Sequence, residues 1–229
     1  MKTRSILITG LLLVSSLFVQ AQTSGGGAPK SSGGIRLNAY GSYAFDDSFD
    51  SYYDYGYYFN GKIKGGFMYG VGVEYEAAPS TFIELYWQSL NTTAPTHYYN
   101  GGIFGEEHTD LDVAINYIML GGNRSFRKPG SMVEGFGGLS AGVGIVNLDN
   151  PKNGRSDSTT KFAWGMKGGA IIWPSEKVGI RLQAQLLSIS QAFGGGVYVG
   201  TGGPGVGVSS YSTVYQFTLG GGLVFNVGG

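Results

Sequence analysis

The sequence contains no cysteine, which excludes disulfide bonds and thiolate chemistry. Charged residues make up only 13% of the 229 residues, about half the share found in typical soluble domains. After residue 21, no stretch approaches the roughly 18 consecutive apolar residues of a membrane-spanning helix. A poorly charged chain without such a helix can still contact lipid if its strands close into a barrel, because closure satisfies every backbone hydrogen-bonding group.

The N-terminus has the features of a secretory signal peptide, which we predict to span residues 1–21. Lys2 and Arg4 precede a mostly apolar segment that ends at the cleavage tripeptide Val19-Gln20-Ala21. The alternative is a retained membrane anchor, but the apolar segment is interrupted by polar residues and is shorter than the roughly 20 residues that a spanning helix needs. We expect residues 22–33, which are rich in Gly and Ser, to form a flexible periplasmic tail.

The charge balance gives no reason to expect nucleic-acid binding. Without Lys2 and Arg4, 13 basic residues face 15 acidic ones, so the mature chain has no basic excess to offer to phosphate groups. No catalytic, metal-ligand or nucleotide motif stands out in the sequence. We therefore expect no cofactor and no metal.

Eight segments between residue 34 and the C-terminus alternate between apolar residues and polar or small ones, as strands with one apolar face do. In the second segment Phe67, Tyr69 and Val71 lie on one face and Gly66, Gly70 and Gly72 on the other, and in the fourth Val113 and Ile115 alternate with polar or small residues. We expect each apolar set to face lipid and each polar or small set to face the interior. The pattern predicts an all-β fold, an eight-stranded antiparallel transmembrane up-and-down β-barrel over residues 34–229.

A soluble barrel with its apolar faces turned inward around a ligand is the alternative. The segments, however, run to about a dozen residues, which is enough to cross a membrane when tilted. Aromatic residues also fall near the segment ends, where interfacial girdles form. These aromatic residues are Tyr43, Phe45, Tyr75, Trp87, Phe162, Trp173 and Phe225.

The connections alternate between tight turns and long loops. The turns contain Pro, Gly or polar residues and fall at 77–80, 126–130 and 174–177. The long loops fall at about 46–61, 91–109, 147–158 and 191–212. Outer-membrane barrels place short turns in the periplasm and long loops outside. We therefore expect periplasmic termini and four extracellular loops, in the outer membrane of a Gram-negative bacterium.

The last segment resembles the C-terminal assembly signal of outer-membrane proteins. Thr218, Gly220, Leu223 and Phe225 match its polar, glycine, apolar and aromatic positions, although four further residues follow Phe225. An ordinary amphipathic strand is the alternative. Together with the export signal, residues 34–229 resemble the small outer-membrane barrels of the OmpA and OmpX type, including the PorT-like group. That resemblance implies outer-membrane lipid, lipopolysaccharide and the barrel-assembly machinery as partners.

Eight strands enclose an interior just wide enough for side chains to fill, which argues against a wide channel. Charged residues on the predicted inner faces fall mainly near the tight turns, and we expect opposite charges to pair across the lumen. This lumen charge cluster comprises Arg36, Glu74, Glu84, Glu134, Lys167 and Arg181. The alternative is that several of these charges are solvated at the rim. The glycine-rich inner faces also leave room for a narrow water path above the cluster.

The first long loop concentrates tyrosines, which can pack against a partner while their hydroxyl groups stay hydrated. The candidate partner-binding residues are Tyr52, Tyr53, Tyr55, Tyr57 and Tyr58. The alternative is that the first two strands continue above the membrane as a hairpin, in which these aromatic side chains form cross-strand pairs.

Barrel enzymes such as lipid A deacylases need an exposed histidine with acidic and serine partners. The two histidines here, His97 and His108, fall in the second long loop without a recognisable serine nucleophile. We therefore expect a monomeric, non-enzymatic outer-membrane protein with a largely filled lumen and a structural or surface-interaction role through its long loops. The alternative is a narrow transport channel or a secretion-associated, PorT-like barrel. The sequence identifies neither an extracellular ligand nor a secretion partner.

Overall fold

The computed structural model describes residues 34–49, 58–99, 106–151, 154–190, 197–200, 207–210 and 214–227. The predicted signal peptide and N-terminal tail lie outside these residues, as do Tyr52, Tyr53, Tyr55, Tyr57 and the side chain of Tyr58. Within the described part of the chain, no helix has the length and apolar character needed to cross a membrane.

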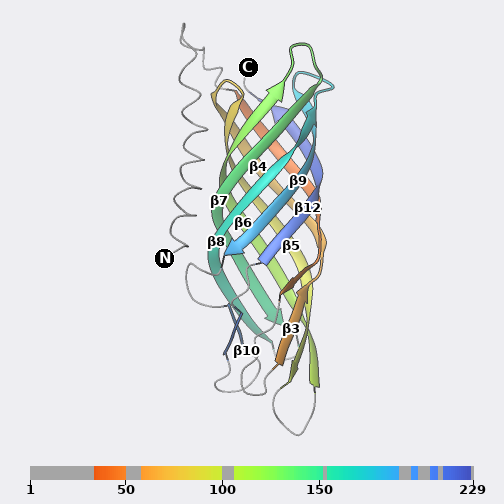
Figure 1. Ribbon diagram of the computed structural model, residues 1–229, viewed down its shortest axis with the longest axis vertical. Coiled ribbons are helices and arrows are strands. Elements are labelled where there is room, and N and C mark those ends of the chain that lie inside the picture. Colours follow the sequence, from red (N-terminus) through yellow and green to blue (C-terminus); the bar gives the residue numbers. More distant parts are fainter. Residues whose placement is uncertain are drawn as a thin grey trace, which may run out of the picture. The chain divides into compact units, whose positions relative to one another are not determined.

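Eight strands close an antiparallel up-and-down β-barrel, which confirms the predicted fold class. Each pairs with the next in sequence, and the first pairs with the last. These strands are β1 (Ile35–Ala44), β4 (Gly66–Ala78), β5 (Thr81–Tyr99), β6 (Glu106–Arg127), β7 (Val133–Asn150), β8 (Arg155–Ile172), β9 (Val178–Ser190) and β12 (Val214–Asn226). The three tight turns lie at one end of the barrel, the short-turn end, and β3 and β10 lie toward the other, the long-loop end (Figure 1).

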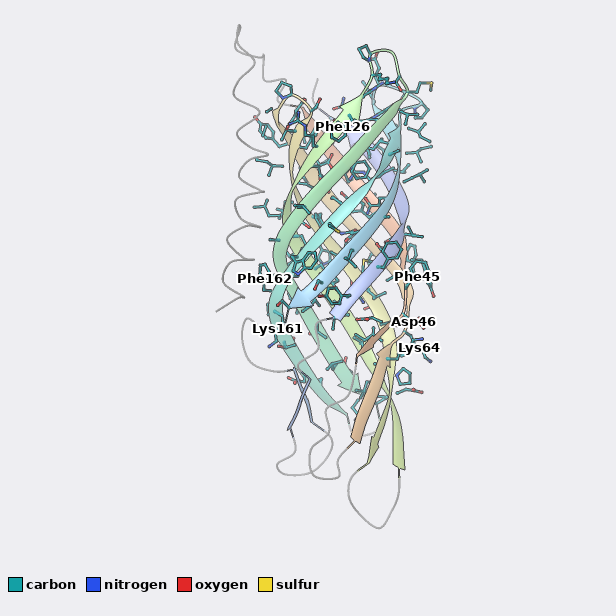
Figure 2. The ribbon with its side chains drawn as sticks, viewed as in Figure 1. Phe45, Asp46, Lys64, Phe126, Lys161 and Phe162 are labelled. Carbon is teal, nitrogen blue, oxygen red and sulfur yellow. The ribbon has the colours of Figure 1, made fainter. Side chains whose placement is uncertain are left out.

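Large apolar side chains cover the outside of the barrel as an apolar belt. Phe126 lies near the short-turn end of this belt, whereas Phe45 and Phe162 lie toward the long-loop end (Figure 2). The charged residues Asp46 and Lys64 lie just beyond Phe45 (Figure 2). Other exposed members of the belt include Leu37, Phe67, Val71, Val73, Leu85, Leu120, Leu139, Met166, Leu182, Leu219 and Leu223.

Seven of the eight strands present the predicted apolar face outward, but the prediction for β6 is wrong. Val113, Ile115 and Tyr117 are buried, and the outward residues of this strand include Ile118 and Leu120. Both faces of β6 carry apolar residues, so alternation alone does not decide which face is inside. Cross-strand register decides it, because Ile118 pairs directly opposite the exposed Val143 of β7.

Trp173 also departs from its predicted place in an interfacial girdle. It follows β8 and is buried, with only 5% of its surface exposed. Its ring nitrogen donates a hydrogen bond to Glu134 inside the barrel. A tryptophan next to a turn can therefore belong to the lumen as well as to the membrane interface.

The long loops are shorter than predicted because the strands continue beyond the apolar belt. The strands β5 and β6 remain paired up to Tyr99 and Glu106, and β7 and β8 up to Asn150 and Arg155. Two further strands, β10 (Val197–Gly200) and β11 (Gly207–Ser210), lie within the predicted fourth loop. Ladder hydrogen bonds join backbone groups, so a polar segment that reads as a loop can still extend a sheet.

The first two strands continue beyond the belt as a hairpin, the alternative considered for the first loop. Strands β2 (Asp47–Phe49) and β3 (Tyr58–Ile63) pair with each other, and β3 also pairs with β5. Asp46 lies between β1 and β2 and links this junction to β3 and the residues after it. Its carboxylate accepts a hydrogen bond from the Gly65 N–H at 2.6 Å and forms an ion pair with Lys62 at 2.5 Å. The Lys62 hydrogen bond and the Gly65 N–H lower the pKa of Asp46.

Candidate functional site in the barrel interior

The structure brings the six residues of the lumen charge cluster together near the short-turn end. Arg36, Glu74 and Glu84 lie side by side on neighbouring strands β1, β4 and β5. The remaining three project from β7, β8 and β9, because inward-facing positions on every strand converge in a narrow barrel. All of them except Arg36 are buried, so these five are interior groups and not solvated rim charges.

Three ion pairs neutralise the cluster. Arg36 binds Glu134 at 2.8 Å and Arg181 binds Glu74 at 2.8 Å. Lys167 pairs with Glu84, whose side chain has no exposed surface. Three positive and three negative side chains therefore leave no net charge in the cluster. This balance matters because an unpaired buried charge is strongly destabilising.

Two polar residues that were not predicted as site residues join two of the ion pairs, Arg181–Glu74 and Lys167–Glu84, into one network. The Asn123 amide donates to Glu74 at 2.9 Å and to Glu84 at 2.7 Å. The Tyr40 hydroxyl donates to Glu84, and Arg181 donates to the Tyr40 oxygen at 3.4 Å. The only sequence signal that pointed to Tyr40 as an interior residue was its alternation with the outward residues of its strand. That signal places a residue inside but does not identify its partner.

Aromatic rings surround the cations of the cluster. The Arg36 guanidinium lies 4.1 Å from the centre of the Phe82 ring, and the Arg181 guanidinium lies 4.7 Å from that of Phe136. The Lys167 ammonium lies 4.5 Å from the centre of the Tyr86 ring. Ring faces attract cations and exclude water, so these aromatics fill the space that water would need to hydrate the charges.

A layer of neutral polar side chains separates the charge cluster from the long-loop end. The Gln88 amide donates to Gln185 at 3.2 Å, and Gln185 donates to the Tyr86 hydroxyl at 3.2 Å. The Tyr86 and Ser140 hydroxyl groups lie 2.7 Å apart. These bonds run between β5, β7 and β9, so they tie opposite walls of the barrel together.

An apolar plug fills the interior beyond this polar layer. Its residues come from β4, β5, β6 and β9, and each has at most 1% of its surface exposed. The plug comprises Met68, Leu90, Ile115, Tyr117, Met119 and Leu187. The Tyr117 hydroxyl crosses the barrel to donate to Gln216 of β12 at 2.7 Å. These side chains occupy part of the space in which the sequence suggested a narrow water path above the charge cluster.

Inward-facing glycines make room for this filling. A Cβ atom at Gly72 would lie 3.1 Å from both the Tyr40 hydroxyl and Glu84 Oε1. A Cβ atom at Gly165 would lie 2.9 Å from a methyl group of Leu187. The glycine-rich inner faces thus accommodate large side chains from other strands and do not form an open channel.

The residues of the predicted assembly signal all lie in β12. Thr218 is fully buried, whereas Leu223 and Phe225 are exposed on the outer face. Gly220 pairs with Ser42 of β1, at the seam where the first and last strands meet. The four residues therefore have the placement of an amphipathic closing strand, and their role in assembly stays a prediction.

The histidines and the acidic side chains outside the lumen charge cluster are the remaining candidates for chemistry. Within the described part of the chain, no group of three or more His, Asp or Glu side chains is placed to hold a metal ion. His97 and His108 lie opposite each other in the β5–β6 ladder, but their side chains lie outside the described residues. The described interior contains charges that are paired and apolar side chains that are packed, which suits closure of the lumen.

Comparison with known proteins supports the architecture. No protein-family model and no curated protein matches the sequence. Neisserial surface protein A is 14% identical over 83% of this chain and 96% of its own, with a TM-score of 0.52. The outer membrane protein OprG from Pseudomonas aeruginosa is 14% identical over 86% of this chain and 97% of its own, with a TM-score of 0.55.

A match to the outer membrane protease OmpT from Escherichia coli is more distant. It is 8% identical over 89% of this chain and 99% of its own, with a TM-score of 0.48. This likeness is too low to carry an argument about proteolysis. The matches to surface protein A and OprG lead to one conclusion: the chain has the fold of the small outer-membrane β-barrels.

Proposed function

We propose that the mature chain is an integral outer-membrane protein, formed after removal of residues 1–21. The apolar belt supports this location, because a soluble protein rarely exposes a continuous apolar surface of this size. The belt gives way to charged residues beyond Phe45 (Figure 2). A signal peptide and a closed barrel together fit export to the outer membrane, where closed sheets satisfy all backbone groups in lipid.

Within that membrane, the barrel acts as a closed, non-enzymatic and monomeric support for its long-loop end. The observation that carries this proposal is the filled interior, in which the ion-paired cluster and the apolar plug lie one above the other. The strand extensions from β5 to β8 then present polar surface outside the membrane. Their role is structural or lies in contacts with surface partners, for which the tyrosines at 52–58 remain candidates.

A conductance measurement tests this function. The purified protein, reconstituted in planar bilayers, is expected to show no stepwise ion currents, because the plug leaves no continuous water-filled path. The same preparation should be heat-modifiable in detergent gels, as a stable closed barrel is. Frequent open-channel steps from a heat-modifiable sample would reject the closed barrel and favour the narrow transport channel. Capture of a secretion partner without conductance would favour a secretion-associated barrel.

We also propose that the short turns and both termini are periplasmic, as in other outer-membrane barrels. Outer-membrane lipid and lipopolysaccharide would then surround the belt, and the barrel-assembly machinery would insert β12. Because the chain has no cysteine, single-cysteine variants report orientation cleanly. Asp157→Cys should react with a membrane-impermeant thiol reagent on intact cells, whereas Ser175→Cys should react only after lysis. Labelling of Ser175→Cys on intact cells would invert the topology.

A further inference from the structure

Exposed charges differ in sign between the β6–β7 turn and the opposite ends of strands β6, β7 and β8. At the β6–β7 turn, Arg124, Arg127 and Lys128 are exposed and no exposed acidic residue lies in the segment 124–132. Described exposed charges at the opposite ends of these strands are all acidic: Asp110, Asp112, Asp149 and Asp157. The β6–β7 turn is therefore suited to anionic groups.

Arg124 is the member of this basic group that belongs to the outer wall itself. It alternates along β6 with the buried residues Asn123 and Ser125, and it shares the outer face with Phe126, which is 63% exposed. No described side chain forms an ion pair with Arg124. Its guanidinium group is therefore available to a ligand at the level where the apolar belt ends.

Next to Arg124, the outer wall has almost no side chains. Arg124 pairs with Gly137, Gly137 with Gly168, and Gly168 with Ala184, so one row crosses four strands. A Cβ atom at Gly137 would have no neighbour nearer than 3.9 Å, and one at Gly168 none nearer than 3.5 Å. We call Gly137, Gly168 and Ala184 the bare furrow.

Large apolar side chains border the bare furrow. Leu139 and Met166 pair with each other on the side toward the long-loop end, and they are 52% and 47% exposed. Leu182, which is 54% exposed, lies on the side toward the short turns. A ligand in the furrow would therefore contact Leu139 and Met166 along one side and Leu182 near its β9 end.

The bare furrow leads from the membrane boundary into the belt. Arg124 lies close to the end of β6 at Arg127, whereas Ala184 lies well inside β9, which begins at Val178. Neighbouring strands are about 4.8 Å apart, so the row from β6 to β9 is about 14 Å long. A charged group at one end and an apolar surface along the rest match the headgroup and chain of a phospholipid.

We propose that Arg124 and the bare furrow bind an anionic phospholipid of the surrounding bilayer. The guanidinium group donates paired hydrogen bonds to the lipid phosphate, a geometry that arginine matches well. Arg127 and Lys128 add positive charge nearby, and one acyl chain lies over Gly137 and Gly168. This inference rests on the proposed insertion of the barrel into a membrane.

Spin-labelled lipids test the headgroup contact. In vesicles of phosphatidylcholine, the wild-type barrel is expected to immobilise labelled phosphatidylglycerol in preference to labelled phosphatidylcholine. In the Arg124→Gln variant, the preference for phosphatidylglycerol over phosphatidylcholine should fall about fivefold. This is the change expected from roughly 1 kcal/mol per basic residue at a membrane surface. The matched control Lys64→Gln removes an exposed charge at the opposite end and should leave the preference unchanged. Equal preference in Arg124→Gln and wild type would overturn the proposal.

A second pair of variants tests the furrow. Gly137→Leu fills open space on the outer wall and should reduce the immobilised phosphatidylglycerol without affecting heat-modifiability. Ala39→Leu makes a similar change on the outer face of β1, away from the furrow, and should behave as wild type. If Gly137→Leu only converts dimers into monomers, the furrow is a contact between two copies and the lipid site is wrong. A wild-type chain that fails to insert at all contradicts the proposed function instead.

Discussion

Replacing Arg181 by leucine is expected to lower the free energy of unfolding by about 3–5 kcal/mol, the cost of leaving a buried charge without its partner. Arg181 is only 1% exposed and binds Glu74 at 2.8 Å. Without it, the carboxylate of Glu74 would keep one hydrogen bond, from Asn123. Urea unfolding of the barrel in detergent measures the change. The folded fraction at each urea concentration is read from the gel, in which folded and unfolded protein migrate as separate bands.

Two further variants separate the loss of pairing from the loss of the side chain. Lys177→Leu removes an exposed cation from the β8–β9 turn and should change stability little. Adding Glu74→Gln to Arg181→Leu removes the orphaned charge and should recover part of the loss. If Arg181→Leu unfolds at the same urea concentration as wild type, the charge cluster does not stabilise the barrel.

Replacing Tyr117 by alanine is expected to have two effects, a loss of about 3–5 kcal/mol of stability, as for other large buried aromatic side chains, and the appearance of ion currents. Tyr117 has no exposed surface and reaches across the interior to Gln216 on β12. Removing its ring opens the middle of the apolar plug and frees the Gln216 amide to bind water. Single-channel recording in planar bilayers detects the opening, and urea unfolding measures the stability.

The neighbouring outward residue provides the matched control. Ile118 is 44% exposed on the outer wall, so its side chain is not part of the apolar plug. Ile118→Ala should therefore remain closed and lose much less stability than Tyr117→Ala. Currents from Ile118→Ala, with none from Tyr117→Ala, would mean that the plug does not close the lumen.

Much of the fold follows from local sequence patterns. Period-two alternation identifies strands because successive side chains point to opposite faces, and it placed the outward faces of seven strands correctly. It failed for β6 because Val113 and Ile115 are apolar on the inner face while Ile118 and Leu120 are apolar on the outer face. The lengths of the loops were also overestimated, because backbone pairing continues where the side chains become polar.

The arrangement of side chains inside the barrel could not be predicted from the spacing of residues in the sequence, because it depends on contacts between distant strands. Charge and strand position suggested that Arg36 and Glu134 face the lumen, but their pairing joins residues 98 positions apart. Trp173 was expected at the membrane interface, and only the closed barrel shows its bond to Glu134. The apolar plug combines side chains of four strands, so no single segment could reveal it.

Local alternation and the need to pair backbone groups are enough to predict the number of barrel strands, the antiparallel barrel and the residue types available for the lumen. Which of these side chains meet depends on the three-dimensional arrangement of the strands. Cross-strand register sets the face of β6 and aligns Arg124 with Gly137 and Gly168, and closure of the barrel brings Arg181 of β9 to Glu74 of β4. Register is a relation between strands distant in sequence, and a shift of one residue would turn every side chain to the opposite face.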